Sequence, residues 1–179
     1  MTMNPDIAAL IRTIPDYPKP GIMFRDVSTL LLDGKGFRLS IDRLIETLKP
    51  DEIELIAGIE ARGFVVAAAL SYALTKGKIM LRKPSKLPGA KVGVNYALEY
   101  GTDRIEIHEG AIKPGDRVLI VDDLIATGGT AMAACELLRG QGAVVTQARF
   151  FVDLPDLGGA AKLRSVGVEP QALVAFGGD

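Results

Sequence analysis

Two neighbouring acids and a glycine-containing loop stand close together in residues 118–130. Asp122 and Asp123 directly follow an apolar run, and a Thr-Gly-Gly-Thr sequence then opens a segment with helical periodicity. Glycines let successive backbone N–H groups converge, threonine hydroxyls add donors, and a helix N-terminus favours negative charge. We therefore expect this loop to bind a phosphate monoester through Ala126, Thr127, Gly128, Gly129 and Thr130.

The acid pair further limits the classes of ligand that this site could bind. Two carboxylates would repel a phosphate unless they faced something else, and ribose hydroxyls with a divalent cation nearby are suitable partners. A sugar phosphate satisfies both features. The common nucleotide motifs do not apply, because no Gly-x-x-x-x-Gly-Lys-Ser/Thr occurs and Gly34-Lys35-Gly36 has Leu39 where the dinucleotide fingerprint needs glycine. A tight strand-to-helix turn without any ligand is the alternative for Gly128-Gly129 taken alone.

Positive charges gather in two other places. Arg62 stands at the predicted start of a helix, where a cation is unfavourable, which points weakly to a bound anion. Arg82, Lys83, Lys86 and Lys91 place four cations in ten residues with no acid among them. Such a cluster can neutralise a multiply charged anion, although a solvated basic loop would show the same composition.

Apolar runs and helical periods alternate along most of the chain, so the elements that position these residues can be predicted. The predicted strands cover residues 53–57, 78–81, 117–121, 143–152 and 172–175. The predicted helices cover residues 36–48, 63–74, 130–139 and 157–166. Strands that are apolar on both faces and alternate with helices indicate an α/β fold, with a mostly parallel central sheet covered by helices on both faces.

Two segments interrupt this alternation within one predicted domain, residues 1–179. Residues 1–35 are expected to form an N-terminal hood, with a helix that begins at Asn4-Pro5 and ends near Thr13, followed by an irregular proline-rich segment. Residues 83–110 are expected to insert a flap, in which strands at 96–98 and 105–107 form a hairpin.

The composition excludes several classes of protein. The chain has 179 residues, 21 Lys and Arg against 22 Asp and Glu, one Cys and one His. A net charge of -1 argues against a nucleic-acid partner, and a single thiol allows no intrachain disulfide. No apolar run reaches the ~18 residues that a membrane span requires, so we expect no membrane partner and a cytoplasmic location. No role is assigned to His108, to Cys135 or to the last residues, 177–179.

The stretch at 118–130 resembles the phosphoribosyl-diphosphate binding motif of the type I phosphoribosyltransferases. Five segments also resemble, in the same order, those of the adenine-specific branch of that family: residues 15–18, 20–26, 57–64, 82–88 and 96–101. The resemblance covers about residues 12–139. It implies transfer of a phosphoribosyl group from 5-phosphoribosyl 1-diphosphate to adenine, with AMP and diphosphate as products, in purine salvage.

The resemblance also implies residue roles around the sugar and the diphosphate. Asp122 and Asp123 would hold the ribose hydroxyls, and the loop at 126–130 would hold the 5-phosphate. The peptide between Glu60 and Ala61 resembles one that is held in the cis form and presents a backbone N–H to diphosphate. The side chains that would bind diphosphate are those of Arg62, Arg82, Lys83 and Lys86.

For the base, the resemblance implies stacking between Phe24 and Leu124, while the backbone of Met23 and Arg25 reads the adenine edge. The position of Ala126 resembles one that is occupied by an Asp in the related hypoxanthine-guanine enzymes. Because alanine cannot ionise, another group must transfer the proton at the base here. Glu99 is the candidate, and a neighbouring aromatic ring could raise its pKa when the flap shuts. Tyr100 would close over the sugar and the reacting centre.

The family uses Mg²⁺, held mainly through the substrate and not by a cluster of protein ligands, and usually forms homodimers in which cationic loop residues can complete the partner's site. Two other functions share parts of the pattern. Some purine-responsive transcriptional regulators resemble this fold and bind phosphoribosyl diphosphate without catalysis, but the roughly 50 residues before the first predicted core strand show no helix-turn-helix pattern. An enzyme for xanthine or hypoxanthine is the second alternative, and Ala126 and the Phe24-Arg25 segment argue against it.

Overall fold

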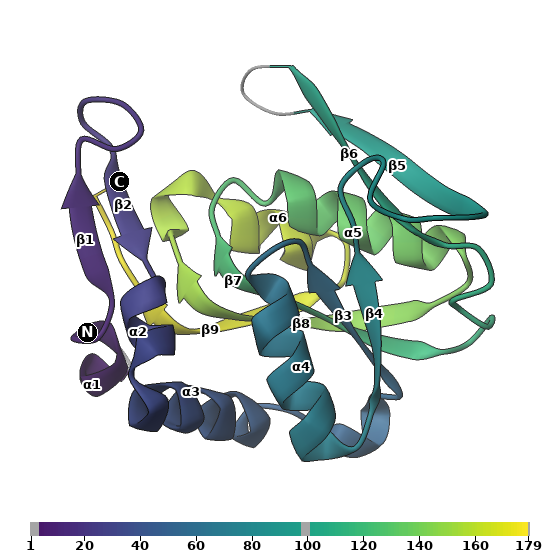
Figure 1. Cartoon of the computed structure of the whole chain (residues 1–179), viewed down its shortest axis with the longest axis horizontal. Coiled ribbons are helices and arrows are strands. Elements are labelled where there is room, and N and C mark those ends of the chain that lie inside the picture. Colours follow the sequence, from purple (N-terminus) through teal and green to yellow (C-terminus); the bar gives the residue numbers. More distant parts are fainter. Residues whose placement is uncertain (1–3, 98–100, 179) are drawn as a thin grey trace.

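A five-stranded parallel sheet forms the centre of the computed structural model, which describes residues 4–97 and 101–178 (Figure 1). Its strands, in spatial order, are β4 (Gly77–Leu81), β3 (Leu55–Ile59), β7 (Arg117–Ile125), β8 (Val144–Asp153) and β9 (Glu169–Ala175). Every neighbouring pair is parallel. The predicted α/β fold with a parallel sheet is therefore confirmed.

Helices cover both faces of this sheet. The helices α3 (Gly34–Glu46) and α4 (Gly63–Leu74) lie on one side, and α5 (Gly129–Gly140) and α6 (Gly159–Ser165) lie on the other (Figure 1). Successive residues of the central strand point to opposite faces, and each face has its own hydrophobic core. Leu119 packs in the core under α3 and α4, and Ile120 packs in the core under α5. Two short 3-10 helices, at Pro50–Glu52 and Pro155–Leu157, precede β3 and α6.

The central strand β7 is longer than its predicted range. The acid pair was expected to follow the strand, but Leu124 and Ile125 pair with Val152 and Asp153 of β8. Asp122 and Asp123 therefore belong to the last part of β7. The apolar run at 117–121 indicates only where the strand begins and where its apolar residues end. The full length of β7 depends on β8, which continues to pair with it up to Ile125.

The N-terminal segment differs most from the prediction. The helix expected up to Thr13 is only α1 (Pro5–Ala8), and it is followed by β1 (Arg12–Pro15), which pairs antiparallel with β2 (Met23–Asp26). A short helix, α2 (Ser28–Leu32), comes next. The side chain of Asn4 makes no capping hydrogen bond to α1: its Oδ1 accepts from Arg43 at 2.8 Å, and its amide donates to the Leu173 carbonyl at 2.7 Å. Tertiary contacts therefore override the local helical pattern.

The predicted hairpin is present and longer than expected. It consists of β5 (Lys91–Ala97) and β6 (Thr102–His108), which run antiparallel and project from the sheet on the side of α5 (Figure 1). Ala97 pairs with Thr102, the last described pair of the hairpin. Within the ranges that the structure describes, no helix is long and apolar enough to cross a bilayer.

Candidate active site

The acid pair lies where β7 approaches its carboxyl end, between β3 and β8. Asp123 is only 6% exposed, and its carboxylate accepts a short hydrogen bond from Nε of Arg62. The carboxylate of Asp122 accepts from the Asp123 N–H at 2.8 Å. Burial raises the pKa of Asp122 well above its ordinary value, and the neighbouring charge of Asp123 raises it further. The charged form of Asp122 is therefore unfavourable in this structure.

The turn before α4 reaches the same edge of the sheet. A Cβ atom on Gly63 would lie 2.9 Å from Oδ1 of Asp122 and 3.0 Å from the Val121 carbonyl oxygen, so only glycine allows this approach. The peptide bond between Glu60 and Ala61 is cis, as the family resemblance implies. The ends of β3 and β7 thus bring the two predicted anion-binding segments together.

The Thr-Gly-Gly-Thr loop makes a sharp turn into α5. Gly128 has a φ of 80°, and a Cβ atom on it would lie 2.8 Å from Cα of Gly159. The N–H of Gly159 donates to the Ala126 carbonyl at 3.0 Å, and Nζ of Lys162 donates to the Thr127 carbonyl at 2.7 Å. The start of α6 therefore supports the loop. The sequence-based prediction does not include this support, for which the local sequence feature is the Gly158-Gly159 pair.

The cations predicted to bind diphosphate are paired with carboxylates in this structure. Nε of Arg82 donates to Glu60 at 3.0 Å, and the backbone N–H of Lys83 donates to the same oxygen at 2.7 Å. Burial by itself would raise the pKa of Glu60, but these two hydrogen bonds lower it below its ordinary value. The side chain of Lys83 makes an ion pair with Asp103, and Lys86 is exposed.

The predicted base-binding segment forms the strand β2. Phe24 is half-buried and packs edge to face against Tyr17, with 5.2 Å between ring centroids. The guanidinium of Arg25 lies 4.5 Å from the centre of the Phe176 ring, so the C-terminal segment reaches the hood beside β2 (Figure 1). Leu124 is half-buried at the end of β7. Glu99 and Tyr100 lie outside the described residues.

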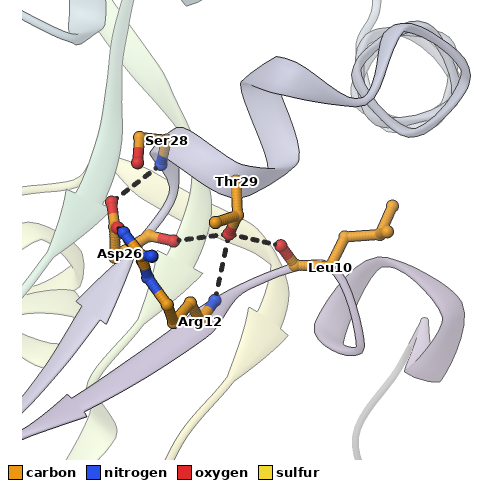
Figure 2. Close-up of polar contacts among 5 residues, drawn as sticks. All are labelled: Leu10, Arg12, Asp26, Ser28 and Thr29. Carbon is orange, nitrogen blue, oxygen red and sulfur yellow. Dashed lines mark hydrogen bonds and ion pairs between the residues drawn. The ribbon is translucent and has the colours of Figure 1, made fainter.

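A polar cluster connects the two hood strands to α2 (Figure 2). The hydroxyl of Thr29 lies 2.7 Å from the Leu10 carbonyl oxygen and accepts from the Arg12 N–H at 3.2 Å. Asp26, which ends β2, accepts from the Arg12 guanidinium at 2.5 Å and from the Ser28 N–H at 3.0 Å. Hydrogen bonds from Ser28 and Arg12 lower the pKa of Asp26 to about 2. A charged carboxylate therefore connects the two hood strands to α2.

Replacing Asp26 with asparagine should lower the stability of the fold by about 1–2 kcal/mol at neutral pH, after allowance for the solvent around Arg12. The pKa of Asp26 is about 2 in the folded state and 3.8 ordinarily, so its contribution is complete above about pH 5 and is lost as the pH falls towards 2. Urea unfolding of the parent chain and of Asp26→Asn from pH 7 to pH 3 measures the difference. If the difference in the free energy of unfolding between the two chains stayed constant down to pH 3, the stabilising role of the charged Asp26 would be contradicted. Asp42→Asn, at an exposed ion pair with Arg38, is the control.

Two residues without an assigned role have ordinary surroundings. Cys135 is a buried free thiol on α5, and burial raises its pKa, which makes it unreactive. His108 is exposed at the end of β6. In the part of the chain that the structure describes, no group of three or more His, Cys, Asp or Glu side chains could hold a metal ion.

A parallel sheet whose central strand ends in an acid pair and a phosphate-type loop is the arrangement of the type I phosphoribosyltransferases. The model of the phosphoribosyl transferase domain family matches residues 30–154, which include every strand of the central sheet except β9.

Relatives identify the branch. An adenine phosphoribosyltransferase of Bradyrhizobium sp. strain BTAi1 is 54% identical over 178 residues, which are 99% of both chains. One from Rhodopseudomonas palustris strain HaA2 is 56% identical over 97% of this chain and 96% of its own length. The crystal structure of adenine phosphoribosyltransferase from Thermoanaerobacter pseudethanolicus matches with a TM-score of 0.90 and 44% identity, over 96% of this chain and 98% of the other. The chain belongs to the adenine phosphoribosyltransferase family.

Proposed function

We propose that this chain transfers the 5-phosphoribosyl group from 5-phosphoribosyl 1-diphosphate to adenine and releases AMP and diphosphate, as an enzyme of purine salvage. The observation that carries this proposal is the meeting of the acid pair, the Thr-Gly-Gly-Thr loop and the Glu60–Gly63 turn at one edge of the sheet, in a chain with these relatives. A yeast relative, 35% identical, has been crystallised with adenine and an imino-altritol bisphosphate. Residues 1–179 would act as one catalytic domain.

The sugar phosphate would bind over the end of β7. Asp122 and Asp123 would accept hydrogen bonds from the ribose hydroxyls, and the backbone N–H groups of residues 126–130 would hold the 5-phosphate. A helix dipole alone contributes only about 0.3–1 kcal/mol at an exposed site, so the converging N–H donors supply most of this binding.

The diphosphate would take over cations that already have anionic partners. Arg62 is paired with Asp123, Arg82 with Glu60, and Lys83 with Asp103. Because Arg62 and Arg82 each exchange a carboxylate for a phosphate oxygen, neither has to pass through an unpaired state, whereas Lys83 can keep Asp103 and use another of its donors. The exposed Lys86 would add charge, and the backbone at Glu60-Ala61 would add a donor.

The base would stack between Phe24 and Leu124. Stacking does not distinguish one purine from another, so the choice of adenine would come from hydrogen bonds to the backbone of Met23 and Arg25. The edge-to-face contact with Tyr17 and the Arg25–Phe176 contact support this segment from both sides.

The proton at the purine nitrogen would be handled by Glu99, with Tyr100 beside it covering the sugar. Ala126, at the position that is acidic in the hypoxanthine-guanine enzymes, has no ionisable group. Bond breaking at the anomeric carbon builds positive charge on the sugar, which the neighbouring carboxylates stabilise.

The donor set at the site also fits Mg²⁺, which proteins usually bind through one or two carboxylates together with substrate phosphates. Asp122 and Asp123 are the carboxylates within reach of such a substrate, and most of the ligands would come from the substrate itself. When bound, the ion would neutralise charge on the departing diphosphate.

A homodimer is supported by an apolar surface on α4 and the adjacent edge strand β4. Tyr72 is 90% exposed, and Val65 and Met80 are each 40% exposed. A helix that is apolar all round normally buries its outer face as well. Because α4 begins at Gly63, a second copy docked there would lie close to the diphosphate-binding turn. The single reduced thiol, Cys135, agrees with a cytoplasmic location.

A magnesium-dependent assay that offers adenine, hypoxanthine, guanine and xanthine in parallel tests this function. With 5-phosphoribosyl 1-diphosphate as the second substrate, we expect AMP from adenine and much less product from the other bases. Product from hypoxanthine with none from adenine would contradict the base assignment. Binding of the diphosphate substrate without any turnover would favour a regulatory protein.

A further inference from the structure

The hydroxyl of Tyr96 joins residues from three separate segments of the chain. It accepts a hydrogen bond from Nζ of Lys83 at 2.8 Å and one from the hydroxyl of Thr130 at 3.3 Å, and it donates to the carboxylate of Asp103 at 2.9 Å. Lys83 also makes a short ion pair with Asp103. Tyr96 and Asp103 are directly paired across β5 and β6, so the hairpin presents both groups together.

These contacts use the full bonding capacity of the phenol oxygen. A tyrosine hydroxyl has one hydrogen to donate and two lone pairs to accept with, and all three are engaged here. Asp103 and Tyr96 occupy two of the three donors of the Lys83 ammonium among the described residues, which leaves the third for a ligand. The group is therefore a fully directed network, in which each member fixes the orientation of the next.

The network spans the two anion-binding regions of the site. Lys83 belongs to the cationic segment that follows β4, and Thr130 belongs to the loop that opens α5. The hairpin packs close to that loop, because a Cβ atom on Gly129 would lie 3.4 Å from the Ala97 carbonyl oxygen and 3.9 Å from the ring of Tyr96. Lys83 is also 5.4 Å from the centre of the same ring. Among the described residues, Tyr96 alone makes hydrogen bonds to both Lys83 and Thr130.

We infer that Tyr96 and Asp103 are positioning residues for phosphoribosyl diphosphate: they orient the ammonium of Lys83 towards the diphosphate, and the Tyr96 hydroxyl also holds Thr130, whose backbone N–H is proposed to bind the 5-phosphate. This inference rests on the proposed function, which assigns Lys83 and Thr130 to the substrate. Neither Tyr96 nor Asp103 needs to touch the substrate or the base. Their effect is expected on the binding of both phosphate-bearing ends and not on the binding of adenine.

Tyr96→Phe is the first test, because it keeps the ring and removes only the hydroxyl. Losing one or two hydrogen bonds of ordinary strength predicts a dissociation constant for 5-phosphoribosyl 1-diphosphate that rises about 5–20-fold, with the KM for adenine within about twofold of the parent value. Calorimetry with inorganic diphosphate and with ribose 5-phosphate, each in the presence of Mg²⁺, should show weaker binding of both ligands.

Asp103 provides a rescue experiment. Asp103→Ala removes the acceptor that holds Lys83 and Tyr96 and should weaken substrate binding to a similar extent. Asp103→Asn keeps an acceptor oxygen and removes a negative charge, so it should restore the dissociation constant to within about threefold of the parent value. Asn95→Ala is the control. It removes an exposed hydrogen bond between Asn95, which lies on the same strand as Tyr96, and Arg104 of β6, and it should change neither the dissociation constant for 5-phosphoribosyl 1-diphosphate nor the KM for adenine.

The outcomes separate this inference from the proposed function. If the parent chain does not bind 5-phosphoribosyl 1-diphosphate, the proposed function fails and the inference fails with it. If the parent chain binds the substrate but Tyr96→Phe and Asp103→Ala bind it equally well, only the inference is wrong. An equal rise in the KM for adenine, or failure of Asp103→Asn to rescue Asp103→Ala, would show a general structural role and would also overturn it.

Discussion

Glu99→Gln is expected to lower the turnover of adenine by about 10²- to 10⁴-fold while the affinity for 5-phosphoribosyl 1-diphosphate stays near that of the parent enzyme. Glutamine keeps the shape of the side chain but cannot take up or release a proton at neutral pH. Of the acids that the structure places at the end of β7, Asp122 and Asp123 are proposed to hold the ribose hydroxyls. Ala126 offers no substitute, so removal of Glu99 should leave the base without its proton carrier.

Single-turnover rates and calorimetry together measure this effect, because they separate chemistry from substrate binding. The pH dependence of turnover gives a second readout, since the ionisation that belongs to Glu99 should disappear from the profile of the variant. Glu109→Gln, just beyond the end of β6, is the matched control for loss of a negative charge near the hairpin. Turnover close to that of the parent chain would remove Glu99 from the mechanism.

Changing Asp122 and Asp123 together to asparagine is expected to weaken binding of 5-phosphoribosyl 1-diphosphate by about 10²- to 10⁴-fold. Hydrogen bonds to charged acceptors contribute roughly 1.5–3 kcal/mol each, and the two acids are proposed to hold two ribose hydroxyls. The substitution also frees Arg62 from its ion pair with Asp123 and so disturbs the diphosphate side. The fold should not lose much stability, because the charged form of Asp122 is already unfavourable and an asparagine in place of Asp123 keeps an oxygen that can accept from Arg62.

Calorimetric titration with the substrate and Mg²⁺ measures the dissociation constant, and thermal unfolding confirms that the double variant is folded. Asp42→Asn on α3 serves as the control for a neutralised surface acid. An unchanged dissociation constant would contradict the assignment of the acid pair to the ribose.

The central sheet and its helices could be predicted because their signals are local. Helix α4 was predicted with the observed bounds, since residues 63–74 are apolar almost without interruption between a glycine and a threonine. Strand β8 was also placed to within one residue at either end. The nearly continuous apolar sequence of α4 and the apolar pairs and runs in residues 143–152 each give a local signal for their own secondary structure.

The hood could not be predicted in the same way. Strands β1 and β2 have four residues each, and their half-exposed side chains show no alternation that marks a strand. They exist because they pair with each other and because Asp26, Arg12 and Thr29 connect them to α2. A two-stranded ribbon of this length has little stability by itself, so its sequence carries a weak signal.

The sequence by itself determined which chemical groups reach the carboxyl edge of the sheet: the acid pair, the glycine-containing loop, and the cations at Arg62 and Arg82–Lys86. These groups lie in the last part of a strand, directly after a strand or at the start of a helix, and this position along the chain is enough to place them at that edge. Only the tertiary structure decided how they pair. The contacts of Arg62 with Asp123, Arg82 with Glu60, and Lys83 with Tyr96 and Asp103 join segments between 13 and 61 residues apart. No periodicity in one segment records where another will lie, so such pairings follow from the packing of the sheet, α4 and the hairpin.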